Sequence, residues 1–232
     1  MLKPRKKVKK QELKEDKLVV TYYKAREFVE KNKKILSYIL TGIVIVVAGI
    51  IIYRNNVKAE NERAEALLSK IISYYDNGDY KTAIDGIPQR NIQGLKYIVE
   101  NYGGTNAGEI ATYYLASAYF MLGDYDNALK YFKKYGGDDK LLFSASLAGI
   151  ASVYEIKGEY KKAGEYFEKA AQRFRENILV PEYLYNAARN YKLAGEREKA
   201  LRLYERIKKD YPNFAKIRDV EIYIASLKGQ ID

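Results

Sequence analysis

The chain has 232 residues and a formal net charge of +11, and it contains neither histidine nor cysteine. Without these two residue types the usual proton shuttle, the thiol nucleophile and most zinc ligands are missing, which argues against an enzyme. We therefore expect no catalytic residue, no metal site and no cofactor. A lipoprotein anchor is also excluded, because acylation requires a cysteine.

Positive charge is concentrated in residues 1–34, which hold thirteen Lys or Arg and five acidic residues. The run KPRKKVKK begins at Lys3, whereas residues 54–232 carry a net charge of only +3. The excess charge therefore belongs to a tail, and no specific nucleic-acid partner is expected. Such a tail could contact anionic lipid or ribosomal RNA, although a topology signal without a ligand is the simpler interpretation. Apolar residues at helical spacing over residues 18–29 predict a short amphipathic helix.

An uncharged run of nineteen residues, ILSYILTGIVIVVAGIIIY, occupies residues 35–53. As a helix it would reach about 28 Å, close to the hydrocarbon thickness of a bilayer. A buried helix of a soluble domain would need a larger core than the rest of the chain offers. A cleaved signal peptide would have a shorter basic region and a small-residue cleavage site, but Tyr53 is followed by Arg54. We expect a single-pass transmembrane helix at residues 35–53.

The distribution of Lys and Arg around this run predicts its orientation. Residues 1–34 are strongly basic, whereas the twenty residues that follow the run contain only Arg54, Lys58, Arg63 and Lys70 as cations. By the positive-inside rule, the N-terminus lies in the cytoplasm. Residues 54–232 are then extracytoplasmic.

Three stretches with a shared pattern occur in this extracytoplasmic part. They are LASAYFMLGDYDNALKYF from Leu115, IASVYEIKGEYKKAGEYF from Ile150 and AARNYKLAGEREKALRLY from Ala187. Their glycines, Gly123, Gly158 and Gly195, are 35 and 37 residues apart. This spacing is close to the period of about 34 residues that is typical of one family of helix-turn-helix repeats.

Each position of the pattern has a physical reason. Small alanines let two helices approach closely, and the glycine ends the first helix because it adopts a left-handed conformation at little cost. An acid follows each glycine, where a helix N-terminus favours negative charge. The pattern resembles the tetratricopeptide repeat, with its aliphatic-small-x-x-Tyr, Gly and Ala-x-x-x-Phe positions. The resemblance implies helical hairpins that stack into a curved solenoid with a concave groove.

A degenerate unit precedes these three, with Ile71, Tyr74 and the stretch NGDYKTAI from Asn77. An insertion must follow it, and we expect an extra helix at residues 95–101 within that insertion. A last helix at residues 215–227 is expected to cap the array. The predicted fold class is therefore all-α: one N-terminal transmembrane helix followed by a tetratricopeptide-repeat helical solenoid at residues 54–232.

In such repeats the first helices supply the groove, and their register predicts a partner-binding surface for peptide segments of other proteins. The residues that we expect there are Tyr113, Ser117, Phe120 and Met121 in the second unit, Ala148, Ser152, Glu155 and Ile156 in the third, and Tyr185, Arg189, Lys192 and Leu193 in the fourth. For Tyr113 and Tyr185, burial in the core is an equally good interpretation. A clamp for C-terminal carboxylates is not expected, because Ser117, Ser152 and Arg189 stand where such clamps use Asn.

The order of basic tail, single span, degenerate unit and clearer repeats, with GLKYIVENY from Gly94, resembles the bacterial YfgM-like family of ancillary SecYEG translocon subunits. The resemblance implies a non-enzymatic scaffold in the bacterial inner membrane with its repeats in the periplasm. Its implied partners are SecYEG, periplasmic chaperones or emerging secreted chains. Two alternatives remain: a scaffold that organises cell-wall or outer-membrane assembly, and an envelope enzyme with unusual acid chemistry.

Overall fold

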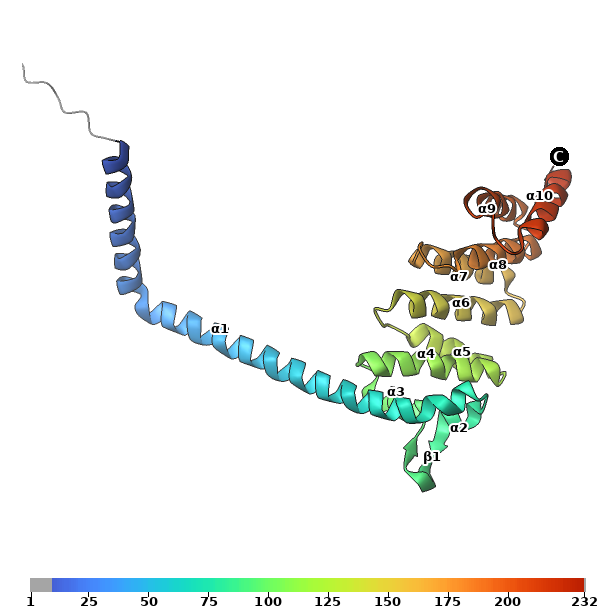
Figure 1. Ribbon diagram of the computed structural model, residues 1–232, viewed down its shortest axis with the longest axis horizontal. Coiled ribbons are helices and arrows are strands. Elements are labelled where there is room, and N and C mark those ends of the chain that lie inside the picture. Colours follow the sequence, from blue (N-terminus) through green and yellow to red (C-terminus); the bar gives the residue numbers. More distant parts are fainter. Residues whose placement is uncertain (1–9, 232) are drawn as a thin grey trace, which may run out of the picture. The chain divides into compact units, whose positions relative to one another are not determined.

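The computed structural model describes residues 10–231 and divides into two compact units, one up to Asn56 and one from Val57 onward. The first nine residues, which include Lys3 and most of the predicted basic run, and Asp232 lie outside the described residues. The fold is helical, as predicted, with one small β-hairpin that the sequence pattern did not predict (Figure 1).

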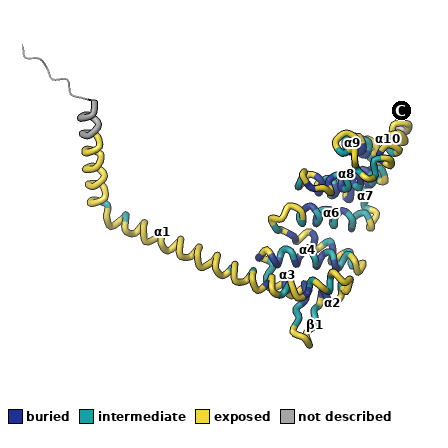
Figure 2. Tube along the Cα trace, in the orientation of Figure 1, coloured by how far each residue is buried: buried dark blue, intermediate teal, exposed yellow. Residues whose placement is uncertain are grey.

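Helix α1 (Lys10–Asp76) contains the predicted amphipathic segment and the predicted span without interruption. Its apolar stretch is long and apolar enough to cross a membrane by length and composition, with a mean hydropathy of 2.8 in its most apolar window. Residues 35–53 are exposed apart from Leu36, which is half-buried, and Figure 2 draws this stretch almost entirely in yellow. The last turns of α1, from Val57, belong to the second unit.

The second unit is built of helical hairpins whose successive helices pack side by side (Figure 1). The two helices of each hairpin are joined by a short turn, and a final helix closes the stack. The hairpins are α4 (Asn106–Met121) with α5 (Tyr125–Lys134), α6 (Lys140–Ile156) with α7 (Tyr160–Arg173), and α8 (Val180–Leu193) with α9 (Arg197–Asp210), and the final helix is α10 (Ile217–Ile231).

The turns within the hairpins share one geometry, which explains the glycine spacing. Gly78, Gly123, Gly158 and Gly195 have φ values of 79°, 78°, 73° and 77°, in the left-handed region that glycine tolerates best. The acid after each glycine donates its backbone N–H over 2.9 Å to the carbonyl of the repeat tyrosine five residues earlier, namely Tyr74, Tyr119, Tyr154 or Tyr191. This pattern satisfies a helix-end carbonyl in every unit.

The side chain of this acid behaves in two different ways. Asp124 accepts a hydrogen bond from the backbone N–H of Asn127, as a short carboxylate at a helix N-cap usually does. Glu196 makes no such cap, and its longer side chain pairs with Lys161 at 3.0 Å and Lys199 at 3.1 Å. The hydrogen bond from Lys161 lowers the pKa of the Glu196 carboxyl.

The insertion between the degenerate unit and α4 contains the β-hairpin. After α2 (Tyr80–Asp85), strand β1 (Gly86–Ile87) pairs antiparallel with β2 (Ile92–Gln93) across the short 3₁₀ helix η1 (Pro88–Arg90). The backbones meet closely here, because a Cβ added to Gly86 would lie 2.3 Å from the carbonyl oxygen of Ile92. Helix α3 (Leu95–Tyr102) follows and corresponds to the extra helix predicted at residues 95–101.

Buried residues form two clusters that together run the length of the second unit (Figure 2). One extends from the end of α1 to α6 and the other from α6 to α10, and Leu147 and Tyr166 pack against both. The alanines expected between paired helices, Ala128, Ala163 and Ala200, are fully buried. The core is thus a continuous stack in which each hairpin covers its neighbour, as in other solenoids.

Candidate peptide-binding groove

A hollow of about 400 Å³ lies between the first helices of two successive hairpins, α6 and α8. Five of the residues predicted for the groove line it together, namely Ala148, Ser152, Glu155, Ile156 and Arg189. The complete lining consists of Ala148, Ser152, Glu155 and Ile156 from α6, Phe167 from α7, and Tyr183, Asn186 and Arg189 from α8. The repeat register therefore brings residues from separate units to one site.

A polar network joins the two helices at this hollow. Arg189 donates from Nη2 to Glu155 Oε1 over 2.5 Å, and Asn190 donates from Nδ2 to Glu155 Oε2 over 2.8 Å. The Asn190 side chain is fully buried and also donates to the carbonyl oxygen of Asn186 over 2.9 Å. Both carboxylate oxygens of Glu155 are thus engaged. The pairing offsets the charge of Arg189, so this part of the groove is less basic than its sequence suggests.

The floor of the hollow is apolar. Phe167 is buried beneath it, Ala148 contributes a small side chain, and Ile156 lies half-exposed at its margin. The Ser152 hydroxyl donates to the carbonyl oxygen of Ala148 over 3.0 Å, which leaves its lone pairs as acceptors. An apolar floor with a few polar groups at the rim is the usual composition of a ligand-binding hollow.

The second-unit groove residues do not line this hollow. Tyr113, Ser117 and Phe120 lie half-buried on α4, and Met121 is exposed at the end of that helix. The Tyr113 ring packs 5.6 Å from Tyr114 and 6.1 Å from Phe132 between ring centroids. Burial raises the pKa of the Tyr113 hydroxyl, so it is a neutral hydrogen-bonding group near pH 7.

Three of the fourth-unit residues also lie apart from the hollow: Tyr185, Lys192 and the exposed Leu193. Tyr185 is only 7 % exposed and packs against the rings of Tyr204, Phe214 and Tyr223 at 5.9 to 6.3 Å, so the structure places it in the core. Burial raises the pKa of Tyr185 to about 12. Lys192 extends over the ring of Tyr223, with its Nζ 4.0 Å from the centroid.

Three lining residues were missed in the sequence: Phe167, Tyr183 and Asn186. Phe167 occupies the second-helix aromatic position of its repeat, which we interpreted only as packing. Asn186 precedes Arg189 by three residues and therefore shares its helix face. That spacing was a signal that could have identified it.

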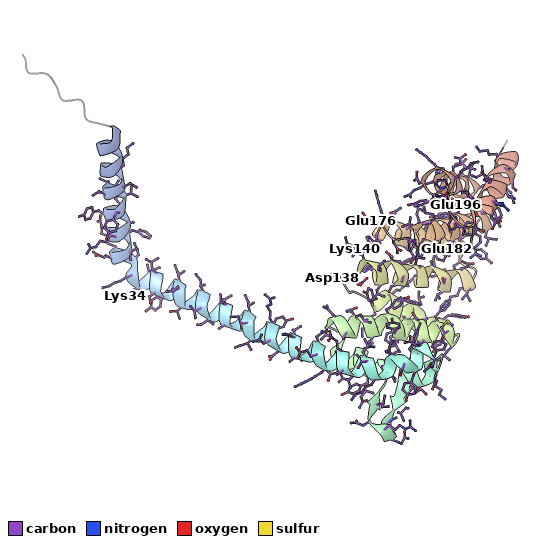
Figure 3. All side chains as sticks on the ribbon, in the orientation of Figure 1. Lys34, Asp138, Lys140, Glu176, Glu182 and Glu196 are labelled. Atoms are coloured by element: carbon purple, nitrogen blue, oxygen red, sulfur yellow. The ribbon has the colours of Figure 1, made fainter. Side chains whose placement is uncertain are left out.

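Ion pairs connect successive hairpins and stabilise the position of the groove helices. Lys157 pairs with Asp126 at 2.5 Å, and Lys216 pairs with Glu182 at 2.5 Å where the chain approaches α10. Figure 3 labels Glu182 and Glu196 at such junctions. Among the described residues, no group of three or more acids could hold a metal ion.

A second hollow, of about 520 Å³, lies away from the groove, between the connections α7–α8 and α9–α10. Its lining includes the exposed Ile178, the buried Asn177 and Phe214. The Asn177 side chain accepts a hydrogen bond from the backbone N–H of Leu179 over 2.9 Å, which shapes this connection.

Comparison with known proteins identifies the repeats. Tetratricopeptide-repeat family models match residues 111–138 and 143–211. No curated protein matches the chain. A crystal structure of nearly identical TPR-like repeats of a candidate kinesin light chain from Podosopora anserina is similar in fold, with a TM-score of 0.53, 17% identity, and coverage of 73% of this chain and 89% of that one. A single-substitution variant of that protein gives the same score and identity, with 88% of its chain covered.

The matched residues run from α4 to α9, over the hairpins whose glycine turns and alanine contacts are described above. The structural similarity concerns the fold alone. The chain therefore carries tetratricopeptide repeats, which follow in the sequence a long N-terminal helix with one apolar stretch.

Proposed function

We propose that the protein is a membrane-anchored scaffold, without enzymatic activity, that binds a segment of a partner protein in the groove between α6 and α8. The main observation in support of this proposal is the hollow between these two helices. Ser152, Glu155 and Arg189 line it, and Phe167 lies beneath them. Tetratricopeptide repeats bind protein partners in general, and their grooves receive extended or helical segments.

The chemistry of the hollow favours one class of segment. Its apolar floor suits an aliphatic side chain, while Ser152 and Asn186 can pair with the backbone of an extended peptide. Because Arg189 is already paired with Glu155, a terminal carboxylate would have to compete for that cation. The expected ligand is therefore an internal, apolar segment and not a charged chain end.

We further propose that the apolar run of α1 spans a bacterial inner membrane, with the N-terminus in the cytoplasm and the repeats in the periplasm. The basic residues before the run and the scarcity of cations after it support this orientation. The YfgM-like order of segments supports a place beside the Sec translocon. In that place the groove would receive emerging secreted chains or periplasmic chaperones.

Site-specific photocrosslinking in cells tests the proposal. A photoreactive residue at Ile156, at the margin of the hollow, should give adducts that mass spectrometry identifies as translocon subunits, chaperones or secreted chains. The matched control is Arg197, which is exposed on α9 and does not line the hollow.

Three results would count against parts of the proposal. Equal adducts from both positions would contradict the groove as the binding surface. Adducts of the residue at position 156 with cell-wall or outer-membrane assembly enzymes would support the alternative scaffold and would contradict the proposed place beside the Sec translocon. Hydrolase activity of the purified chain that one carboxylate substitution abolishes would contradict the absence of enzymatic function.

A further inference from the structure

Residues 17–34 of α1 carry an apolar face that is exposed in the described part of the first unit. Leu18, Tyr22, Ala25 and Val29 follow one another at steps of four, three and four residues, which places them on one side of the helix. Leu18 is 70% exposed and Tyr22 is 63% exposed. Among the described residues of the first unit, α1 is the only element, so these side chains are unpartnered there.

This segment also carries an excess of positive charge, with six cations and two acids. Each acid is already paired one turn away, Glu30 with Arg26 at 2.9 Å and Glu27 with Lys31 at 2.7 Å. The remaining cations, which carry the net charge of the segment, are Lys17, Lys24, Lys33 and Lys34. An anionic surface would therefore be attracted to the segment as a whole.

Cations lie on both sides of the apolar face, two of them close to it. At about 100° per residue, Arg26 and Lys33 lie about 50° to 70° from the centre of the face on one side, and Lys17 and Lys24 lie about 110° to 130° from it on the other. Glu30 lies about as far from the centre as Lys17, and Glu27 lies nearly opposite the face. Lysine and arginine at the borders of an apolar face can extend to phosphate groups while their hydrocarbon stems remain in contact with lipid.

The helix changes direction beside Lys34, which Figure 3 labels at the bend. The Asn32 side chain donates from Nδ2 to the carbonyl oxygen of Phe28 over 2.8 Å, one turn earlier. A side chain that bonds to a carbonyl of the helical ladder competes with the backbone N–H and is a recognised cause of bending. Residues 17–34 can thus depart from the direction of the span that begins at Ile35.

We propose that residues 17–34 lie along the cytoplasmic membrane surface and bind anionic phospholipid headgroups. This inference rests on the proposed span and orientation. The apolar face favours lipid over RNA, because an RNA partner would engage the cations but leave Leu18, Tyr22 and Val29 in water. A bilayer surface offers acyl chains to the apolar side chains and anionic headgroups to the cations. The segment adjoins that surface where the proposed span begins, at Ile35.

The absence of tryptophan from the chain allows a single reporter to be introduced. Two adjacent tyrosines form a matched pair, since Tyr22 lies on the apolar face and Tyr23 is turned about 100° away from it. The full chain with Tyr22→Trp is reconstituted in vesicles that contain phosphatidylglycerol. Its tryptophan fluorescence should be quenched by lipids that carry bromine near the headgroup. We expect about twofold stronger quenching than in phosphatidylcholine alone, because the cations are attracted to the anionic surface.

Three further variants make the result decisive. Tyr23→Trp should be quenched less than Tyr22→Trp in the same vesicles. A triple variant combines Tyr22→Trp with Lys24→Gln and Lys33→Gln. In vesicles with phosphatidylglycerol, its fluorescence should be quenched only as much as that of Tyr22→Trp in phosphatidylcholine alone. Ile43→Trp, within the span, should be quenched by deeply brominated lipid in both vesicle compositions.

The outcomes separate this inference from the proposed span. If Ile43→Trp is quenched as expected but Tyr22→Trp and Tyr23→Trp behave alike, or show no effect of phosphatidylglycerol, the surface helix is wrong and the span stands. If Ile43→Trp is not quenched by lipid, the span itself is wrong. Acrylamide, a soluble quencher, reports whether the introduced tryptophan is exposed to water. If single-stranded RNA, and not phosphatidylglycerol, protects the fluorescence of Tyr22→Trp from acrylamide, the partner is RNA and the lipid proposal is overturned.

Discussion

Gly108, on α4, faces a backbone atom that leaves no space for a side chain. An added Cβ would lie 1.8 Å from the carbonyl oxygen of Tyr102, and a backbone carbonyl cannot rotate aside as a side chain can. Alanine is otherwise preferred to glycine within a helix by roughly 1 kcal/mol. We nevertheless predict that Gly108→Ala lowers the free energy of unfolding by about 1 to 3 kcal/mol, measured by urea denaturation followed by circular dichroism.

The control for this prediction is Gly104, four residues earlier in the turn before α4. Nothing lies within 4 Å of a Cβ built at Gly104. Gly104→Ala should therefore change the free energy of unfolding by no more than about 0.5 kcal/mol. A similar cost at both positions would mean that α4 does not approach Tyr102 as closely as the structure shows.

At this scale the sequence identified some groove residues and could not place others. Ser152, Glu155 and Arg189 follow from the repeat register, because the glycine turns fix which face of each first helix points to the groove. The position of Tyr185 depends on Phe214 and Tyr223, which lie about thirty and forty residues further along the chain. Local periodicity carries no information about such a contact, so the core and the groove were equally good interpretations.

The pairing of helices within a hairpin depends on alanines that admit no larger side chain. Ala128 on α5 and Ala163 on α7 are fully buried in the core. We predict that Ala128→Leu or Ala163→Leu separates the paired helices and lowers the free energy of unfolding by about 1 to 3 kcal/mol. Urea denaturation of the full chain in detergent, followed by circular dichroism, measures this loss.

A matched substitution on the helix of Ala128 distinguishes packing from a general effect of added leucine. Lys134 is exposed in the last turn of α5. Lys134→Leu adds a similar apolar side chain without filling the core, and it should change stability by no more than about 0.5 kcal/mol. Unchanged stability in both alanine variants would show that the register assigned to the repeats is wrong.

The elements differ in how far the sequence predicts them, and the difference has a physical cause. The hairpins follow from local signals: glycine in the turn, an acid after it, and small residues at steps of three and four. The β-hairpin has only two residues in each strand, too few for an alternating pattern. It depends on the close approach of Gly86 to Ile92 and of Gly94 to Ile84, which is a contact between backbones.

For the whole molecule, buried tyrosines make stability depend on alkaline pH. Burial is the main cause that raises the pKa of both Tyr135 and Tyr185 to about 12, and nearby Asp139 adds to it for Tyr135. In the unfolded chain the pKa of a tyrosine is about 10. Between these values the unfolded state loses the phenolic proton and the folded state keeps it, so the unfolded state binds fewer protons and stability falls as pH rises.

The contribution of these two groups is fully present below about pH 10 and is lost as pH rises through about 12. We predict that the free energy of unfolding decreases over this window by up to about 1.4 kcal/mol per pH unit for each tyrosine. Urea denaturation of the full chain in detergent at a series of alkaline pH values measures the slope. Tyr135→Phe and Tyr185→Phe should each reduce it, whereas Tyr97→Phe, which removes an exposed phenol, should leave it unchanged.

The orientation of the whole chain can be tested with thiols, because the sequence contains no cysteine. Cations are concentrated before the apolar run and are few after it, so the positive-inside rule places Lys7 in the cytoplasm and Asn213 on the other side. We predict that Lys7→Cys is shielded from a membrane-impermeant thiol reagent applied to the outer side of the inner membrane, whereas Asn213→Cys is labelled. Disruption of the membrane should expose both positions. The reverse pattern in intact membranes would place the repeats in the cytoplasm, and labelling of both would mean that the apolar helix does not separate them.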